Sequence, residues 1–169
     1  MPSPQYDRVD RLILDHLQRF GRTPNNELAE AVSLSPSACL RRTRALEEAG
    51  LIAGYRAELD QRRLGLGLTV FVALKVERHS RQTSQAVEDA LMEIPAVVAC
   101  HVVSGEADFL LEAVLPDLEA YEGILLDRIL AIPHIIDAHS TFAIRTVRSR
   151  GPMPLEDWPS RRRSGPTSG

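Results

Sequence analysis

Hydrophobic residues recur every three or four positions through the first third of the chain, which is the spacing of amphipathic helices. The first predicted helix spans residues 7–20 and ends at Gly21; its apolar stripe consists of Val9, Leu12, Ile13 and Leu17. A second, shorter helix is expected to begin with Thr23 as N-cap and Pro24 in the first turn, and to end near Ser33.

A third predicted helix follows the second after a very short connection. Ser35 is a good N-cap and Pro36 suits the first helical position, so this helix is expected to run from Pro36 to Ala49, before Gly50. Two helices joined by so short a turn must cross steeply. The pattern therefore predicts a helix-turn-helix motif.

The third predicted helix also carries a cluster of basic residues. We expect Leu40, Thr43 and Leu46 to face inward, with Arg41 and Arg42 outward and Arg44 toward one flank. An isolated Arg-Arg-x-Arg run is usually a solvated helix face. Beside the tight turn it favours contact with the major groove of DNA. The residues predicted to contact DNA are Ser35, Ser37, Ala38, Arg41, Arg42 and Arg44.

Residues 51–59 (LIAGYRAEL) are expected to form a short extended wing after the third helix. With it, residues 1–59 make a winged helix-turn-helix DNA-binding domain. Residues 60–67 (DQRRLGLG) form a linker, because Gly and Arg interrupt the pattern there.

Beyond the linker the period of the hydrophobic pattern changes from helical to alternating. Strands are predicted over 68–77, 97–104, 108–115 and 135–147, and helices over 82–94 and 118–131. The order β-α-β-β-α-β predicts a ferredoxin-like domain over residues 68–148. A faint repeat supports it, since Ile94-Pro95-Ala96-Val97-Val98 resembles Ile132-Pro133-His134-Ile135-Ile136 at the second helix-to-strand junction. The fold class is therefore α+β.

The predicted sheet would carry both of its helices on one face. Apolar residues nevertheless occupy both faces of the strands, for instance Phe71 and Ala73 beside Val70 and Val72. A second copy of the chain is the expected cover. A dimer would also present two recognition helices to a palindromic DNA site.

The composition is that of a globular protein and does not by itself indicate a function. Of the 169 residues, 44% are hydrophobic and 25% charged, which is typical of a globular protein. No apolar run approaches the length of a membrane span and the N-terminus does not resemble a signal peptide, so we expect a cytoplasmic protein with no membrane partner. Cys39 and Cys100 lie far apart without metal-ligand spacing, and we expect no bound metal or cofactor.

Charge is unevenly distributed along the chain. Residues 1–60 carry 8 basic and 9 acidic groups, residues 61–144 carry 6 and 12, and residues 145–169 carry 6 and 2. An acidic middle excludes diffuse DNA binding, so any contact must be focused on one element. Residues 149–169 are predicted to form a flexible basic tail, in which Arg161, Arg162 and Arg163 either add weak DNA attraction or do nothing.

Several motifs in this order resemble the Lrp/AsnC family of transcription regulators, over about residues 6–148. The stretches that carry the likeness are Asp7 to Leu14, Leu34 to Arg42, Leu46 to Tyr55 and the hairpin Val103-Ser104-Gly105-Glu106-Ala107-Asp108-Phe109. The resemblance implies an ACT-like (RAM) ferredoxin-like domain that pairs subunits, commonly as dimers assembled into tetramers or octamers. It also implies a small effector, often an amino acid, bound between dimers.

The same resemblance implies which residues would hold that effector. Ser104 and Gly105 would offer backbone groups to a carboxylate, Asp108 a counter-charge to an ammonium, and Thr141 a hydroxyl from a neighbouring subunit, with His101 at the same interface. Simpler alternatives stay open. Asp108 could cap the hairpin backbone, Gly105 could serve only a turn, and His101 could be a packing residue.

Two other functions are compatible with the same plan. Siroheme decarboxylases resemble it, which makes an enzyme the main alternative. The five histidines His16, His79, His101, His134 and His139 are scattered, and no catalytic spacing stands out. A DNA-binding architectural protein without an effector is the other alternative. We therefore expect a regulator and not an enzyme.

Overall fold

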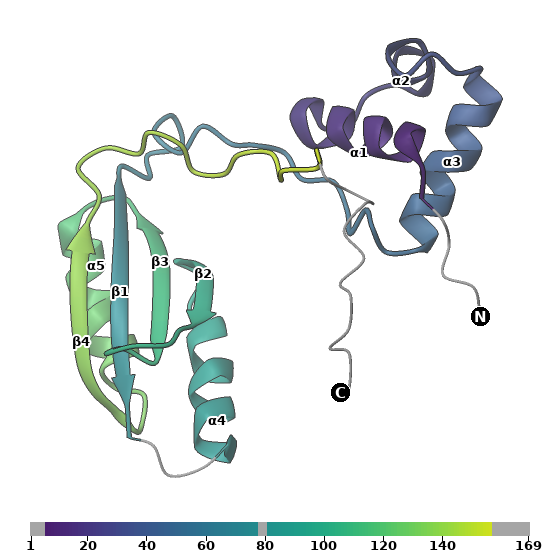
Figure 1. Ribbon diagram of the computed structural model, residues 1–169. Helices are drawn as coiled ribbons and strands as arrows, with labels where there is room; N and C mark the ends of the chain where they lie inside the picture. The colour runs from purple at the N-terminus through teal and green to yellow at the C-terminus, as the bar shows by residue number, and fades with distance from the viewer. Residues whose placement is uncertain (1–5, 78–80, 157–169) are drawn as a thin grey trace, which may run out of the picture. The chain divides into compact units, whose positions relative to one another are not determined.

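The computed structural model describes residues 6–77 and 81–156. They divide into two compact units. The helical unit holds the residues up to Glu58 and those from Arg148 onward, and the sheet unit holds Leu59–Val147. Figure 1 shows the three helices of the first unit and the sheet with its helices in the second.

The helical unit consists of α1 (Arg8–Phe20), α2 (Asn25–Ala31) and α3 (Pro36–Glu48). Their shared core is formed by Ile13, Leu17, Leu28, Ala29, Val32, Cys39 and Leu46. The short turn between α2 and α3 is closed by the Leu34 amide, which donates to the Ala29 carbonyl at 2.9 Å. Ser33 turns the chain there with a φ of 56°. The predicted helix-turn-helix is confirmed.

One local prediction in the helical unit was wrong. Pro24, not Thr23, precedes α2, and no side chain caps that helix; the Thr23 hydroxyl instead pairs with His16 Nε2 at 3.2 Å. The expected wing, residues 51–59, contains no strand. Tyr55 holds this segment to α3, because its hydroxyl donates to Glu47 Oε1 at 2.9 Å.

The sheet unit has the predicted β-α-β-β-α-β order. Its elements are β1 (Leu68–Val76), α4 (Arg81–Met92), β2 (Val97–Val102), β3 (Phe109–Leu115), α5 (Leu118–Ile124) and β4 (Ile135–Phe142). The four strands are antiparallel in the order β2-β3-β1-β4, which is the ferredoxin-like arrangement. The predicted second helix changes character partway, because α5 continues as a five-residue π-helix, η1 (Leu125–Ile129).

Both helix-to-strand junctions of the predicted repeat close in the same way. The Val97 amide donates to the Ile94 carbonyl, and the Ile135 amide to the Ile132 carbonyl. The α4 and α5 helices then pack on one face of the sheet, where Val72, Leu74 and Leu111 are fully buried with Leu91.

Neither α4 nor α5, the described helices of the sheet unit, covers the opposite face of the sheet (Figure 1). Strand register places Phe71, Ala73 and Leu110 on this open face, together with Thr141 of β4. Phe71 is 37% exposed although it lies in a central strand. The apolar pattern on both faces of the strands is therefore confirmed, and within the sheet unit α4 and α5 cover only one of these faces (Figure 1).

The segment after β4 was predicted to be a flexible tail from residue 149 onward. As far as Glu156, it instead contacts α1. Gln18 of α1 and Met153 form a reciprocal pair, in which the Met153 amide donates to Gln18 Oε1 at 2.8 Å and Gln18 Nε2 donates to the Met153 carbonyl at 3.1 Å. Arg11 Nη1 also donates to the Glu156 carbonyl, at 2.5 Å. Arg161, Arg162 and Arg163 lie outside the described residues.

Across residues 6–77 and 81–156, none of the helices has the length and apolar character that a bilayer crossing requires.

Candidate DNA interface and effector site

Ser35 and Pro36, from which the start of α3 was predicted, do begin this helix. Ser35 Oγ accepts from the Ala38 amide at 3.3 Å, and Pro36 occupies the first turn. Asn25 of α2 donates to the Pro36 carbonyl at 2.9 Å, which ties the two helices at the turn. Ser37 lies beside this cap, with its hydroxyl 3.3 Å from that of Ser35.

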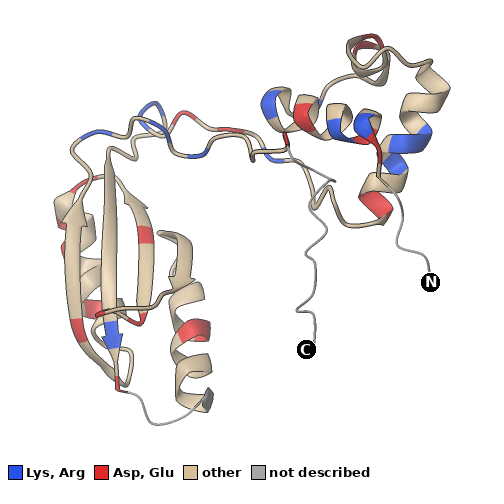
Figure 2. Ribbon diagram, viewed as in Figure 1, with Lys and Arg blue, Asp and Glu red and all other residues tan. Residues whose placement is uncertain are grey.

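One face of α3 points away from the helical core. Its residues follow helical spacing and border a surface hollow of about 460 Å³: Ser37, Leu40, Arg41, Arg44, Ala45 and Glu48. Both Arg41 and Arg44 are exposed there. Figure 2 shows basic residues on α3, whereas acidic residues recur through the sheet unit. Three of the six predicted DNA contacts thus share one exposed helix face.

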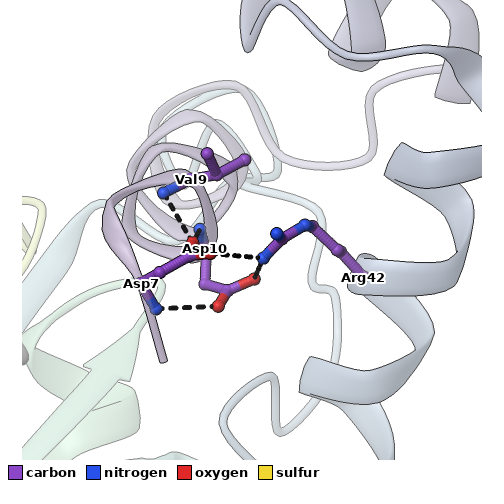
Figure 3. A network of polar contacts seen from close by, with 4 residues as sticks. All are labelled: Asp7, Val9, Asp10 and Arg42. Carbon is purple, nitrogen blue, oxygen red and sulfur yellow. Dashed lines mark hydrogen bonds and ion pairs between the residues drawn. The ribbon is translucent and has the colours of Figure 1, made fainter. Parts of the chain in front are cut away.

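Arg42 does not belong to that face, contrary to the sequence prediction. Its Nη1 lies 2.9 Å from Asp7 Oδ2 and 2.9 Å from Asp10 Oδ1, so the guanidinium turns toward α1 (Figure 3). Asp10 is only 7% exposed. A nearly buried carboxylate requires such a partner, which gives Arg42 a structural role.

The inward face of α3 also differs by one position from the prediction. Cys39 is fully buried, whereas Leu40 is 40% exposed. Cys39, Arg42 and Leu46 therefore face the rest of the unit, with Thr43 partly buried. Leu40 joins the outward face, where an apolar side chain can contact the methyl group of thymine.

Asp7 completes the start of α1. Its Oδ1 accepts from the Val9 and Asp10 amides at 2.8 and 3.0 Å, and its own amide donates to Asp10 Oδ2 at 2.9 Å. The hydrogen bond from the Asp10 amide is the main cause that lowers the pKa of Asp7, and Arg42 lowers it further. The sequence signal for this network was the Asp-x-x-Asp spacing of a capping box.

The predicted effector hairpin lies between β2 and β3. Ser104 and Gly105 are exposed at its tip, and Gly105 adopts a φ of 128°, which favours glycine. The Asp108 amide donates to the Leu74 carbonyl, and Asp108 Oδ2 accepts from the Val76 amide at 2.9 Å. The Asp108 side chain therefore caps the backbone of β1, and the Asp108 carbonyl accepts from the Val103 amide across its own hairpin at 3.0 Å.

The other two predicted effector residues lie on opposite edges of the sheet. His101 is exposed on β2 and Thr141 is exposed on β4, with β3 and β1 between them. Three steps of strand spacing separate these edges by about 14 Å. One chain does not bring Thr141 to the hairpin, in keeping with its expected origin in a neighbouring subunit.

A small hollow borders the hairpin where Asp108 meets α4. It has a volume of about 230 Å³, and its walls combine acidic and apolar side chains. Glu77, Glu88 and Asp108 supply carboxylates, and Val76, Val102 and Phe109 supply apolar surface. Glu88 was missed because nothing in its helical spacing links it to the hairpin. Within the two described stretches, no group of three His, Cys, Asp or Glu residues could hold a metal.

This fold and these faces define a two-domain DNA-binding regulator, and comparison with known proteins agrees. Residues 6–53 match a family model described as winged helix-turn-helix DNA-binding, and residues 69–153 match the Lrp/AsnC ligand binding domain. The chain is 37% identical over 147 residues to the leucine-responsive regulatory protein of Klebsiella pneumoniae, covering 87% of this chain and 90% of that one.

Two solved structures resemble the chain over about nine-tenths of its length. A transcriptional regulator from Neisseria meningitidis, in complex with L-Met, has a TM-score of 0.86 and 34% identity, covering 90% of this chain and 98% of its own. An AsnC family regulator from Agrobacterium tumefaciens gives the same score and identity over 90% and 99%. The chain belongs to the Lrp/AsnC family of DNA-binding transcription regulators. These relatives carry the names of regulators and lend no support to the enzyme alternative.

Proposed function

We propose that this chain recognises an operator through the outward face of α3 and that an amino acid modulates that recognition. The observation that carries the proposal is the placement of Arg41 and Arg44 on one exposed face behind a helix-turn-helix. The start of α3, with Ser35, Ser37 and Ala38, would enter the major groove. Arg42 is left out of the proposed contact set because two carboxylates already hold it.

The proposed effector site is the hairpin and the hollow beside it. An α-amino acid needs donors for its carboxylate, an acceptor for its ammonium and an apolar slot. Ser104 and Gly105 would supply backbone donors, Asp108 and Glu88 negative charge, and Phe109 apolar surface. The L-Met complex of the Neisseria relative supports this class of ligand. His101 and the Thr141 of a second copy would complete the site.

The proposed assembly is a homodimer formed through the open face of the sheet, with dimers joining into a tetramer or octamer. The bare, partly apolar face around Phe71 supports it. An effector can control DNA binding in such an assembly only if it binds one arrangement of subunits more tightly than another. We propose that this effector-controlled DNA binding takes place in the cytoplasm.

DNA recognition is tested with Arg41→Ala, because Arg41 is exposed and forms no ion pair with any residue that the structure describes. We expect operator affinity to fall by about 1–3 kcal/mol in fluorescence anisotropy if Arg41 contacts a base, with the size of the assembly unchanged in light scattering. Full operator affinity in this variant would overturn the assignment of the α3 face.

Effector binding is tested by thermal shift with each of the twenty amino acids. A ligand that binds only the folded protein raises its melting temperature. An increase with one or a few amino acids, lost in Asp108→Ala but kept in a control variant Glu119→Ala on α5, would support the site. No increase with any amino acid would discard the amino-acid effector and leave the DNA-binding proposal standing.

A further inference from the structure

The loss of Arg42 from the DNA face leaves α3 with few cations for the phosphate backbone. Glu48 borders the same hollow as Arg41 and Arg44, and residues 1–60 are slightly acidic as a whole. Phosphate contacts nevertheless supply much of the affinity of DNA-binding proteins. Further cations of the helical unit should therefore lie near α3.

A second hollow in the helical unit gathers such cations from separate parts of the sequence. It has a volume of about 580 Å³ and lies between the end of α1 and the segment that follows α3. Arg19, Arg22 and Arg56 border it, against a single acidic residue, Glu58. Arg19 is already held by Asp15 at 3.0 Å.

Arg22 and Arg56 differ from Arg19 and Arg42 in that no described carboxylate pairs with their guanidinium groups. Both side chains are exposed, and neither forms an ion pair with any residue that the structure describes. Arg22 follows Gly21, whose φ of 69° ends α1 and turns the chain. These two residues are 34 positions apart and reach one hollow only because of the fold.

Tyr55 fixes this hollow relative to α3. It borders the hollow beside Arg56, and its hydroxyl donates to Glu47 in the last turn of α3. Burial and the Glu47 carboxylate raise the pKa of Tyr55 to about 12, so the hydroxyl keeps its proton and this hydrogen bond at neutral pH. The segment that carries Arg56 is thus attached to the recognition helix although it forms no strand.

We propose that Arg22 and Arg56 bind phosphate groups of the DNA backbone beside the stretch that α3 reads. The inference rests on the proposed DNA-binding function and adds a second, sequence-independent contact to it. Two exposed guanidinium groups on one hollow suit anionic oxygens, since arginine donates to phosphate in a fixed planar geometry. Base recognition stays with the face around Arg41.

The test compares the double variant Arg22→Ala/Arg56→Ala with the full-length wild type. The probes are an operator duplex selected in vitro from a random-sequence pool and a scrambled duplex of the same length. Affinity is measured by fluorescence anisotropy at several salt concentrations. We expect both duplexes to lose affinity by a similar factor, on the order of tenfold, and the salt slope to shrink by about 1.8 per protomer, which is 0.9 for each lost phosphate contact.

Two further variants separate phosphate binding from a change of fold. Arg22→Lys/Arg56→Lys keeps both charges and should retain most of the salt slope. Arg62→Ala/Arg145→Ala removes the same net charge from the sheet unit and should leave the slope unchanged. Circular dichroism melting checks that each variant is folded.

An unchanged slope in the alanine double variant would overturn the inference, as would an equal loss in the sheet-unit control. A loss confined to the operator duplex would overturn it too, because it would indicate base recognition. If the wild type bound neither duplex, the proposed function itself would fail. If Arg41→Ala weakened operator binding and the double variant did not, only the present inference would fail.

Discussion

Arg42 Nη1 lies 2.9 Å from Asp10 Oδ1 and joins the middle of α3 to the first turn of α1 (Figure 3). The two residues are 32 positions apart, and Asp10 is nearly buried. An arginine that resembles a DNA contact in the sequence instead pairs with α1, within the helical unit that carries the proposed DNA-reading helix.

Replacing Arg42 should therefore reduce stability before it affects recognition. We expect Arg42→Ala to lower the free energy of unfolding by about 1–3 kcal/mol, because Asp10 loses its cationic partner while it stays desolvated and keeps only the hydrogen bond from the Asp7 amide. Urea denaturation measures the loss, and Arg41→Ala is the matched control with an exposed arginine. In a double-mutant cycle, Arg42→Ala should cost much less when Asp10 is already alanine. Equal costs in both backgrounds would contradict this role for the pair.

The same network makes stability depend on pH in the acid range. The pKa of folded Asp7 is lower than its ordinary value of 3.8, chiefly through the Asp10 amide. A lowered folded pKa contributes stability that is present above the unfolded value and is lost as the pH falls through the folded pKa. We expect the melting temperature to drop as the pH falls below about 5. Asp7→Asn, which still caps the helix, should flatten part of that drop.

Asp15 provides the comparison for that experiment. Its pKa is also lowered, first by the hydrogen bond from Arg19 and then by Gln18. That pair joins two surface side chains one helical turn apart, and such pairs contribute little, whereas the pKa of Asp7 is lowered chiefly by a backbone amide that the helix holds in place. Asp15→Asn should therefore flatten the acid dependence less than Asp7→Asn does. The reverse order would place the sensitive carboxylate outside the α1–α3 network.

These contacts explain which parts of the structure were readable from sequence. The start of α3 was predicted correctly because Ser35 and Pro36 act within one turn of the chain. The strands were predicted because alternation between Val70, Val72 and Leu74 reflects burial of one sheet face directly. Both signals are local. The position of Arg42 depends on carboxylates in another helix, and no spacing within α3 reveals them.

The one-position error on α3 has a different origin. Leu40 is larger and more hydrophobic than Cys39, so the pattern assigned Leu40 to the core. Free cysteine, however, is among the most buried residue types and packs as a small hydrophobe. With Cys39 inward, the face bearing Arg41 and Arg44 follows directly. The contacts of Met153 and Glu156 with α1 had no sequence signal, because they join the two ends of the chain.

Tyr55 should contribute modestly to the stability of the helical unit, and this contribution should depend on pH. Tyr55→Phe removes the hydrogen bond to Glu47 and should cost about 0.5–1 kcal/mol at pH 7. The folded pKa of about 12 exceeds the ordinary value of 10.0. The contribution of Tyr55 to stability is therefore fully present below about pH 10 and is lost as the pH rises toward 12. Urea denaturation at pH 7 and pH 11 measures both values. A difference between wild type and variant that persists unchanged at pH 11 would contradict the assignment.

The contact between Gln18 and Met153 can be tested by proteolysis. Gln18→Ala removes both hydrogen bonds to the Met153 backbone, so the segment after β4 should detach more often. We expect faster tryptic cleavage after Arg148 and Arg150 than in the wild type, followed by mass spectrometry. Asn26→Ala, an exposed substitution in the same unit, should cleave at the wild-type rate. Equal rates for all three proteins would mean that the pair does not hold the segment.

The return of the chain to α1 affects how freely the three helices can rotate relative to the sheet unit. The polypeptide leaves the helical unit after Glu58 and comes back to it after Val147, so the three helices are joined to the sheet unit by one covalent linker and by the hydrogen bonds that hold Met153 and Glu156 on α1. A domain on one linker can rotate about it with little resistance. Here, turning the three helices would either carry the segment after β4 with them or break the hydrogen bonds between Gln18 and Met153.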